Sequence, residues 1–247
     1  MITREEIVRV IRERIEPLPF VQSFFEAGSV SFGNDDELSD MDLVVDAEDG
    51  RAGEVFCEVE EALNVLAPFD SVWRVPEPAW HGYSQRFYHL AGTPEYLYVD
   101  FLVRADGKPP RLNEVEQHGT PRVYFDKTGV TAVAHLGTEG LEEKLAARVE
   151  SISGSLPMLA AFVRKEIARG NAADAMHYYQ TGVLRPLVEL LRIRLSPLRH
   201  TFGLRYLKQD IGEENANRIA KLSYAKDMDE LMECVAEAQR WFEELTA

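Results

Sequence analysis

FFEAGSVSFGNDDELSDMDLVV, residues 24–45, sets the architecture of the first half of the chain. It joins two apolar segments, rich in the β-branched and aromatic residues typical of strands, through a polar stretch that begins with Gly28 and Ser29. Side chains two residues apart in a strand point to the same face, so we expect Asp40 and Asp42 to present their carboxylates on one side. Two carboxylates on one face are half of a metal site.

A third carboxylate stands in EYLYVDFLV, residues 95–103, which we predict to be a strand. Alternation places Asp100 on the face of Tyr96 and Tyr98, and a carboxylate there is costly unless a cation or hydrogen bonds compensate it. If this strand pairs beside residues 41–46, three carboxylates meet. Hard oxygen ligands of this kind suit Mg²⁺, which usually binds one or two carboxylates together with substrate phosphates.

GSVSFGNDDELSDMD and the later strand acid together resemble the nucleotidyltransferase signature of the DNA polymerase beta superfamily. That signature is a Gly-Ser pair, then Asp-x-Asp after a short loop, with a third Asp on a later strand. The resemblance implies that Gly28 and Ser29 contact the outer phosphates of a nucleotide. It also implies that Asp40, Asp42 and Asp100 are the catalytic and metal-binding residues and hold two Mg²⁺ ions.

The resemblance covers residues 20–103 and implies an activity. The chain would transfer a nucleoside monophosphate, with ATP as the default donor, to a hydroxyl of a small molecule and release pyrophosphate. KEIARGNAADAMHYYQTGVLRPLVELLRI, residues 165–193, is also similar to the helices of aminoglycoside 6-adenylyltransferases, so an aminoglycoside-type antibiotic is one candidate acceptor. Two alternatives stay open: a non-catalytic nucleotide-binding or interaction module of the same fold, and an enzyme that transfers AMP to a protein.

One position departs from the signature. Many relatives carry a basic residue directly after Gly-Ser, whereas this chain has Val30. The positive partner of the triphosphate should therefore come from the second half, where we assign Lys165 to nucleotide binding. Further candidates are Arg185, Arg192, Arg194, Arg199, Arg205 and Lys208. The alternative for these arginines is that they form ion pairs on helix surfaces and at helix C-termini.

The first half mixes helices with strands. Thr3 and Glu6 form a capping box for a helix that Pro17 ends, and residues 51–67 repeat apolar residues at helical spacing. The segments predicted as strands are 21–28, 41–47, 71–76, 84–90, 95–103 and 121–126. We therefore predict an α/β (α+β) nucleotidyltransferase fold with a mixed β-sheet.

The second half is predicted to be an all-α helical bundle with joints at Gly154, Gly170 and Pro197. We assign residues 1–135 to a nucleotidyltransferase catalytic domain and residues 136–247 to a helical substrate-binding domain. A cleft between the two is the expected substrate site.

Composition excludes several classes of protein. The chain has 247 residues, of which 45% are hydrophobic and 28% charged, as in ordinary globular proteins. Its longest apolar runs are too short for a membrane span, and its N-terminus lacks the apolar core of a signal peptide, so we expect a cytoplasmic protein. Its two cysteines suggest no disulfide framework, and its six histidines show no zinc-ligand spacing.

The acidic charge is concentrated in the first half. The net charge is −15, and residues 1–135 hold 12 Lys or Arg against 25 Asp or Glu, whereas residues 136–247 hold 15 against 17. Because nucleic-acid binding requires Lys and Arg to neutralise phosphates, a nucleic-acid partner is not expected. An acidic surface suits metal cations, cationic small molecules or solubility alone. The sequence makes no prediction of oligomeric state.

Overall fold

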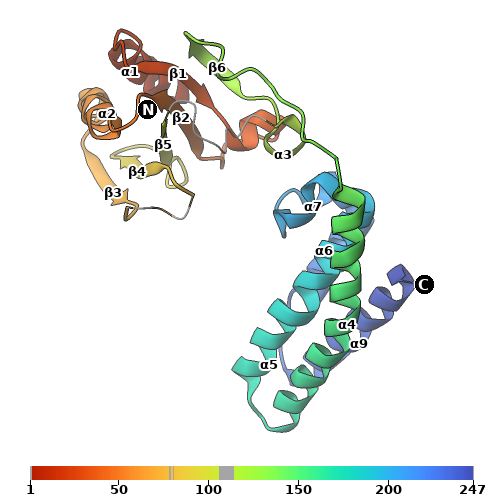
Figure 1. The fold of residues 1–247 in the computed structure, drawn as a ribbon. Coiled ribbons are helices and arrows are strands. Elements are labelled where there is room, and N and C mark those ends of the chain that lie inside the picture. The colour runs from red at the N-terminus through yellow and green to blue at the C-terminus, as the bar shows by residue number, and fades with distance from the viewer. Residues whose placement is uncertain (1, 78, 80, 106–113, 247) are drawn as a thin grey trace. The chain divides into compact units, whose positions relative to one another are not determined.

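The computed structural model describes residues 2–77, 79, 81–105 and 114–246. Contacts within the chain divide it into two compact units, Met1–Leu136 and Gly137–Ala247. The first unit contains a mixed β-sheet with helices, and the second is helical (Figure 1). The predicted fold class, a mixed α/β half followed by an all-α region, is confirmed.

The first helix, α1 (Arg4–Ile15), begins as the sequence predicts. The Thr3 hydroxyl accepts a hydrogen bond from the Glu6 backbone N–H at 3.2 Å, and the Glu6 carboxylate accepts one from the Thr3 N–H at 2.9 Å. This capping box satisfies two of the donors that a helix start leaves without partners. The buried side of the helix consists of Ile7, Val10, Ile11 and Ile15.

Six strands in the described part of the first unit form one sheet in the order β3-β4-β5-β2-β1-β6. They are β1 (Val21–Glu26), β2 (Met41–Ala47), β3 (Phe69–Arg74), β4 (Ser84–Leu90), β5 (Val99–Ala105) and β6 (Arg122–Asp126). The pair β2 and β5 is parallel, and the other pairs are antiparallel. Short helical segments η1 (Gly28–Phe32) and α3 (Val115–His118) lie outside the sheet.

One face of the sheet packs against α1 and α2 (Ala52–Leu66) and forms the core of the first unit. Met41, Leu43 and Phe101 point into this core and are fully buried. Since side chains alternate along a strand, the residues between them face the other side. That opposite face carries Asp42 and Asp100.

The strand predicted at residues 95–103 begins later than expected, at Val99. The segment before it forms tight turns, in which the Leu97 N–H donates to the Pro94 carbonyl and the Tyr98 N–H donates to the Tyr96 carbonyl, each at 2.9 Å. The prediction that the strand begins at residue 95 is therefore wrong, and the alternation expected from Tyr96 does not apply. Asp100 is the second residue of β5.

The second unit consists of helices around their own core (Figure 1). They are α4 (Leu141–Ala168), α5 (Ala172–Tyr179), the π-helical η2 (Gln180–Leu184), α6 (Arg185–Leu195), η3 (Pro197–Phe202), α7 (Leu207–Ile211), α8 (Glu213–Leu222) and α9 (Met228–Thr246). Helix α4 contacts α5, α6 and α9. No helix among the described residues is long and apolar enough to cross a membrane.

The predicted joint at Gly154 is wrong, because α4 continues through both Gly154 and Pro157. One apolar stripe runs along the whole helix into the core, and its buried members include Ile152, Leu156, Ala160 and Val163. Packing of this stripe outweighs the low helix propensity of the two interrupting residues. The joints at Gly170 and Pro197 are confirmed, since α4 ends just before Gly170 and α6 ends before Pro197.

Candidate functional site

The site centres on two carboxylates that neighbouring strands place side by side. Asp42 of β2 is the register partner of Asp100 of β5, and the strands are parallel. Neighbouring strands lie about 4.8 Å apart, so the two side chains leave the same face of the sheet as immediate neighbours. Both residues are partly buried. The sequence predicted that these two acids would meet if their strands paired, and the strands do pair.

Asp40 lies directly before β2 and is exposed. It is near enough that its charge raises the pKa of Asp100. The described residues contain no group of three or more His, Cys, Asp or Glu side chains already arranged to hold a metal ion. The assignment of Asp40, Asp42 and Asp100 as one ligand set therefore stays a prediction.

Asp100 is held in an unusual environment for a carboxylate. Burial, with a further contribution from the charge of Asp40, raises the pKa of Asp100 to about 6. The Gln85 side-chain N–H donates to Asp100 Oδ1 at 2.7 Å, and this hydrogen bond lowers the pKa of Asp100. Perturbed carboxylates of this kind are candidates for cation binding or proton transfer.

A short chain of hydrogen bonds orients Gln85. The Tyr83 N–H donates to His81 Nδ1 at 3.2 Å, which assigns the ring proton of His81 to Nε2. His81 Nε2 lies 3.0 Å from Gln85 Oε1, so the amide oxygen of Gln85 accepts there and its nitrogen faces Asp100. Sequence reasoning missed both residues, because a lone Gln or His carries no motif.

Gly28 brings the backbone into contact with the Asp42 carboxylate. Gly28 has a φ of +64°, and a Cβ added there would lie 1.6 Å from Asp42 Oδ2. The Ala27 N–H also donates to the Asp42 carbonyl at 2.8 Å. Only glycine fits this position, because any side chain would occupy the space of the carboxylate and strain the backbone.

Ser29 carries a buried hydroxyl that is left unsatisfied. Its Oγ is inaccessible to solvent and has no hydrogen-bond partner within the described part of the chain. An unpaired buried hydroxyl costs free energy, which a bound oxygen ligand such as a phosphate would recover. The Gly-Ser pair therefore has two features that a simple turn between strands does not require: a close approach to a carboxylate and an unused hydroxyl.

The polar segment that begins at Gly28 starts with a short helix. The strand predicted at residues 21–28 ends at Glu26, and Gly28–Phe32 forms a 3-10 helix. Before Asp40 the chain makes a closed turn, in which Asp36 accepts from the Leu38 N–H at 2.9 Å and the Ser39 hydroxyl accepts from the Asp36 N–H at 3.0 Å. This turn leads directly into β2.

Lys165, predicted to bind the nucleotide, belongs to α4 of the second unit. Its Nζ lies 3.3 Å from Glu166 Oε1 and 4.8 Å from the centroid of the Phe162 ring. Nearly half of its side chain is exposed, so it is accessible to a ligand. Its role in nucleotide binding stays a prediction.

Two of the other candidate arginines serve the fold of the second unit. Arg192 is fully buried and donates to the Gly203 carbonyl at 2.8 Å, and both Arg192 and Arg199 pair with the carboxylate of Asp210. These contacts agree with the alternative of structural ion pairs. Arg185 and Arg205 instead line a cavity of about 590 Å³ in the second unit.

Two buried ionic clusters were missed in the sequence. Asp46 accepts hydrogen bonds from Ser23 and Arg104, all three being buried, and Glu26 accepts from Arg4. Each lies in a segment that reads as an apolar strand, so the signal was an acid among the apolar residues of a strand. The same signal singled out Asp100.

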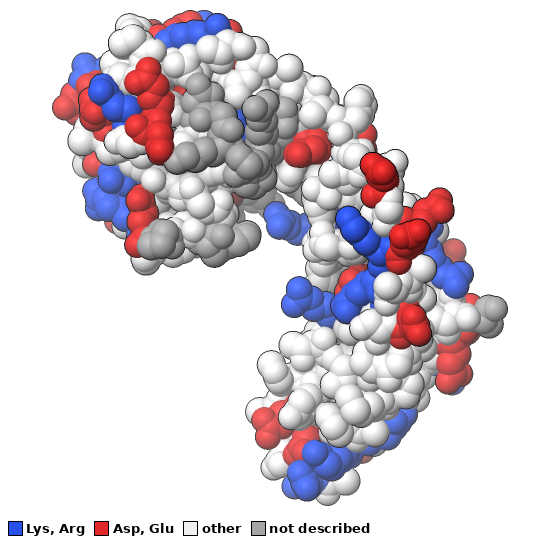
Figure 2. All heavy atoms as spheres, in the orientation of Figure 1, with Lys and Arg blue, Asp and Glu red and all other residues white. Residues whose placement is uncertain are grey.

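The donor set of this site suits a hard cation. Carboxylate oxygens such as those of Asp42 and Asp100 are ligands that Mg²⁺ prefers, and this ion usually binds one or two carboxylates together with phosphate groups. On the face drawn in Figure 2, acidic and basic side chains of the first unit are interspersed. The predicted excess of acid in this unit is a property of its composition, with 25 acidic against 12 basic residues in positions 1–135.

No family model and no curated protein matches this chain. Solved structures do match. An aminoglycoside 6-adenyltransferase from Bacillus subtilis aligns over 99% of this chain and 89% of its own, with 10% identity and a TM-score of 0.36. A nucleotidyltransferase-like protein from Exiguobacterium sibiricum 255-15 aligns over 98% and 74%, with 13% identity and a TM-score of 0.38.

A third match is a spectinomycin adenyltransferase from Enterococcus faecialis, solved with ATP and spectinomycin. It aligns over 98% of this chain and 100% of its own, with 8% identity and a TM-score of 0.38. All three structures are named as nucleotidyltransferase-like proteins or adenyltransferases.

Proposed function

We propose that this protein is a Mg²⁺-dependent nucleotidyltransferase that transfers a nucleoside monophosphate, AMP from ATP, to a hydroxyl of a small molecule. The observation that supports this most is the pairing of Asp42 with Asp100 in parallel register, with the Gly28 backbone against the Asp42 carboxylate. Neighbouring carboxylates of this kind can hold the metal ion that a metal-assisted phosphoryl transfer requires.

The reaction is an in-line displacement at the α-phosphorus. The acceptor hydroxyl oxygen forms a bond to that phosphorus, the bond from the α-phosphorus to the bridging oxygen breaks, and pyrophosphate leaves with the electron pair. Bound Mg²⁺ would supply charge neutralisation for the phosphates and a lower pKa for the acceptor hydroxyl.

We assign each residue a role in that reaction. Asp40 and Asp42 hold the cation that accompanies the triphosphate. Ser29 would donate its unused hydroxyl to an outer phosphate oxygen, and Gly28, which has no side chain, lets the backbone lie against the Asp42 carboxylate. Asp100 faces the acceptor side, where it would complete the cation site and take the proton of the acceptor hydroxyl.

The acceptor that we favour is a hydroxylated, cationic small molecule. The acidic excess of the first unit attracts cations, and an aminoglycoside combines many hydroxyls with positive charge. The named substrates of two structural neighbours, an aminoglycoside and spectinomycin, belong to the same chemical group.

The test is pyrophosphate release from ATP and Mg²⁺ over a panel of aminoglycosides, spectinomycin, lincosamides and simple polyols. We expect release with at least one acceptor and none when EDTA replaces Mg²⁺. ATP binding without turnover on every acceptor would favour a non-catalytic module. Labelling of a protein by ATP in the absence of small acceptors would favour a protein substrate.

A further inference from the structure

Arg4 occupies a position that is unfavourable for its own helix. It is the first residue of α1, where the helix dipole favours acidic side chains, and Glu5 and Glu6 follow it in the same turn. A cation there opposes the dipole. The reason for an arginine at this position must therefore lie outside the helix.

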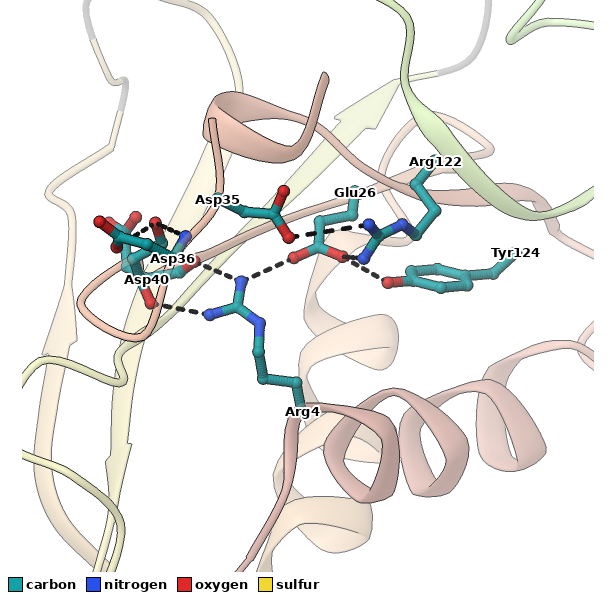
Figure 3. Close-up of polar contacts among 8 residues, drawn as sticks. Arg4, Glu26, Asp35, Asp36, Asp40, Arg122 and Tyr124 are labelled. Atoms are coloured by element: carbon teal, nitrogen blue, oxygen red, sulfur yellow. Dashed lines mark hydrogen bonds and ion pairs between the residues drawn. The ribbon is translucent and has the colours of Figure 1, made fainter. Parts of the chain in front are cut away.

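The Arg4 side chain reaches the end of the loop that leads into β2 (Figure 3). Its Nη1 donates to the Ser39 carbonyl and its Nη2 donates to the Asp40 carbonyl, each at 2.7 Å. These two residues immediately precede Met41, the first residue of β2. One guanidinium group thus binds two successive carbonyls at the start of the metal-ligand strand.

The same peptide is held from its other side. The Met41 N–H donates to the Tyr98 carbonyl at 2.9 Å, just before β5 begins. The peptide unit between Asp40 and Met41 therefore has its carbonyl bound by Arg4 and its N–H bound by the neighbouring segment. Its orientation determines where the Asp40 side chain starts.

Glu26 holds the guanidinium in place. It is the last residue of β1, and only 2% of its side chain is exposed. Its carboxylate accepts from Arg4 Nη2 at 3.0 Å and from the Tyr124 hydroxyl at 2.5 Å, with Arg122 Nη1 at 3.5 Å (Figure 3). A buried carboxylate with two guanidinium partners is compensated, and the planar fork of Arg4 keeps a fixed orientation.

The rest of the loop before Ser39 lies at the surface. Residues 33–38 are exposed. Asp36 and Ser39 close their own turn, and Asp35 lies 3.8 Å from Arg122. Arg4 is thus the group that ties the carbonyls next to Asp40 to a rigid helix.

We propose that Arg4, held by Glu26, is a positioning residue that fixes the backbone of Asp40 and so sets the affinity of the carboxylate site for Mg²⁺. This inference rests on the proposed function of Asp40, Asp42 and Asp100 as metal ligands. Partners that orient metal ligands typically change metal affinity about 10–100-fold when they are removed.

Three variants of the full chain test the proposal. Arg4→Gln removes the charge and the forked donor. Arg4→Lys keeps the charge beside Glu26 but lacks a planar pair of donors for the two carbonyls. Arg9→Gln is the matched control, because Arg9 lies on the same helix and pairs only with exposed Glu13, at 3.4 Å, among the described residues.

The first measurement is hydrogen exchange of the backbone amides in residues 34–42, made by mass spectrometry without metal or nucleotide. We expect faster exchange in this segment for both Arg4 variants and exchange like the wild type for Arg9→Gln. This readout does not depend on any activity. Unchanged exchange in both Arg4 variants would show that Arg4 does not hold the loop and would overturn the proposal.

The second measurement is the Mg²⁺ concentration that gives half-maximal ATP binding, taken well below the unfolding temperature of each variant. We expect this concentration to rise about 10–100-fold in both Arg4 variants, with turnover at saturating Mg²⁺ largely retained. A purely structural role would lower the unfolding temperature without this rise, and Arg4→Lys would then restore wild-type behaviour. That result overturns the proposal.

The two proposals fail in different ways. If the wild type binds Mg²⁺ and ATP but the Arg4 variants need no more Mg²⁺, the positioning role is wrong and the proposed function stands. If the wild type shows no Mg²⁺-dependent ATP binding, both are wrong. Should Arg4→Gln not fold, Arg4→Lys gives the same comparison on its own.

Discussion

Asp42 and Asp100 are register partners on parallel strands, so two carboxylates leave one face of the sheet side by side. Without a cation this arrangement is unfavourable, because burial and the nearby charge of Asp40 both disfavour the ionised form of Asp100. A divalent cation would remove that penalty.

The metal-free protein should lose stability as the pH rises through the range in which Asp100 ionises. The pKa of Asp100 is raised from 3.8 to about 6, so the folded state holds this proton more tightly than the unfolded state. The contribution of Asp100 to stability is therefore greatest below pH 4 and falls between pH 4 and pH 6.

Asp100→Asn removes this titration while the asparagine oxygen still accepts from Gln85. We expect the variant to unfold at a higher temperature than the wild type at pH 7 without metal, with the difference shrinking towards pH 4. Thermal unfolding followed by circular dichroism at the two pH values measures it. A difference that does not change with pH would be inconsistent with a buried, titrating Asp100.

Gly28→Ala should displace the Asp42 carboxylate. The added Cβ would lie 1.6 Å from Asp42 Oδ2 at a positive φ, so either the backbone or the carboxylate must move. We expect a stability loss of about 1–3 kcal/mol and a loss of Mg²⁺-dependent ATP binding. Denaturant unfolding and calorimetry measure the two effects.

Gly154→Ala is the control for that variant. Gly154 lies in α4 with no atom near an added Cβ, and its φ is not positive. Alanine there should stabilise the helix by about 0.5–1 kcal/mol and leave ATP binding unchanged. A Gly28→Ala protein that behaves like Gly154→Ala would exclude the close approach of Gly28 to Asp42.

Some features of the fold and of the candidate site could be predicted from the sequence, and others could not. The capping box of Thr3 and Glu6 is local, so three residues of spacing were enough to place the start of α1. The pairing of β2 with β5 is not local, so the sequence could state it only as a condition, which the observed register meets.

The features that the sequence did not predict also depend on contacts between residues that are distant in the sequence. Gly154 was predicted to break a helix because propensity is local, whereas the burial that keeps α4 continuous is tertiary. The ion pair between Arg4 and Glu26 joins residues that are 22 positions apart in the sequence, and neither residue belongs to a motif. Ionic partners of this sort become visible only when the helix is placed against the sheet.

The protein should not extend nucleic acids. The first unit, which carries the carboxylates, has 25 acidic against 12 basic residues in positions 1–135, and strand binding requires several phosphate contacts from Lys or Arg. We expect no Mg²⁺-dependent extension of a DNA or RNA primer at ordinary salt, as measured on a denaturing gel. Addition of even a few nucleotides would show that a polymer can be the acceptor.

Asp100→Asn should separate nucleotide binding from turnover. If Asp100 faces the acceptor hydroxyl, the variant keeps most of its affinity for ATP with Mg²⁺ and loses pyrophosphate release. Loss of general-base assistance alone lowers the rate about 10²–10⁴-fold. Near-normal turnover in this variant would remove Asp100 from the catalytic residues.

The central claim, that Asp42 and its neighbours hold Mg²⁺ for a nucleotide, is tested most directly by calorimetry of ATP binding at saturating Mg²⁺. The comparison is between the wild type, Asp42→Asn, and Glu37→Gln as a charge control, since Glu37 is exposed in the loop before Asp40. The account predicts tight Mg²⁺-dependent binding by the wild type and Glu37→Gln, and none by Asp42→Asn. Equal ATP affinity in Asp42→Asn and the wild type would contradict it.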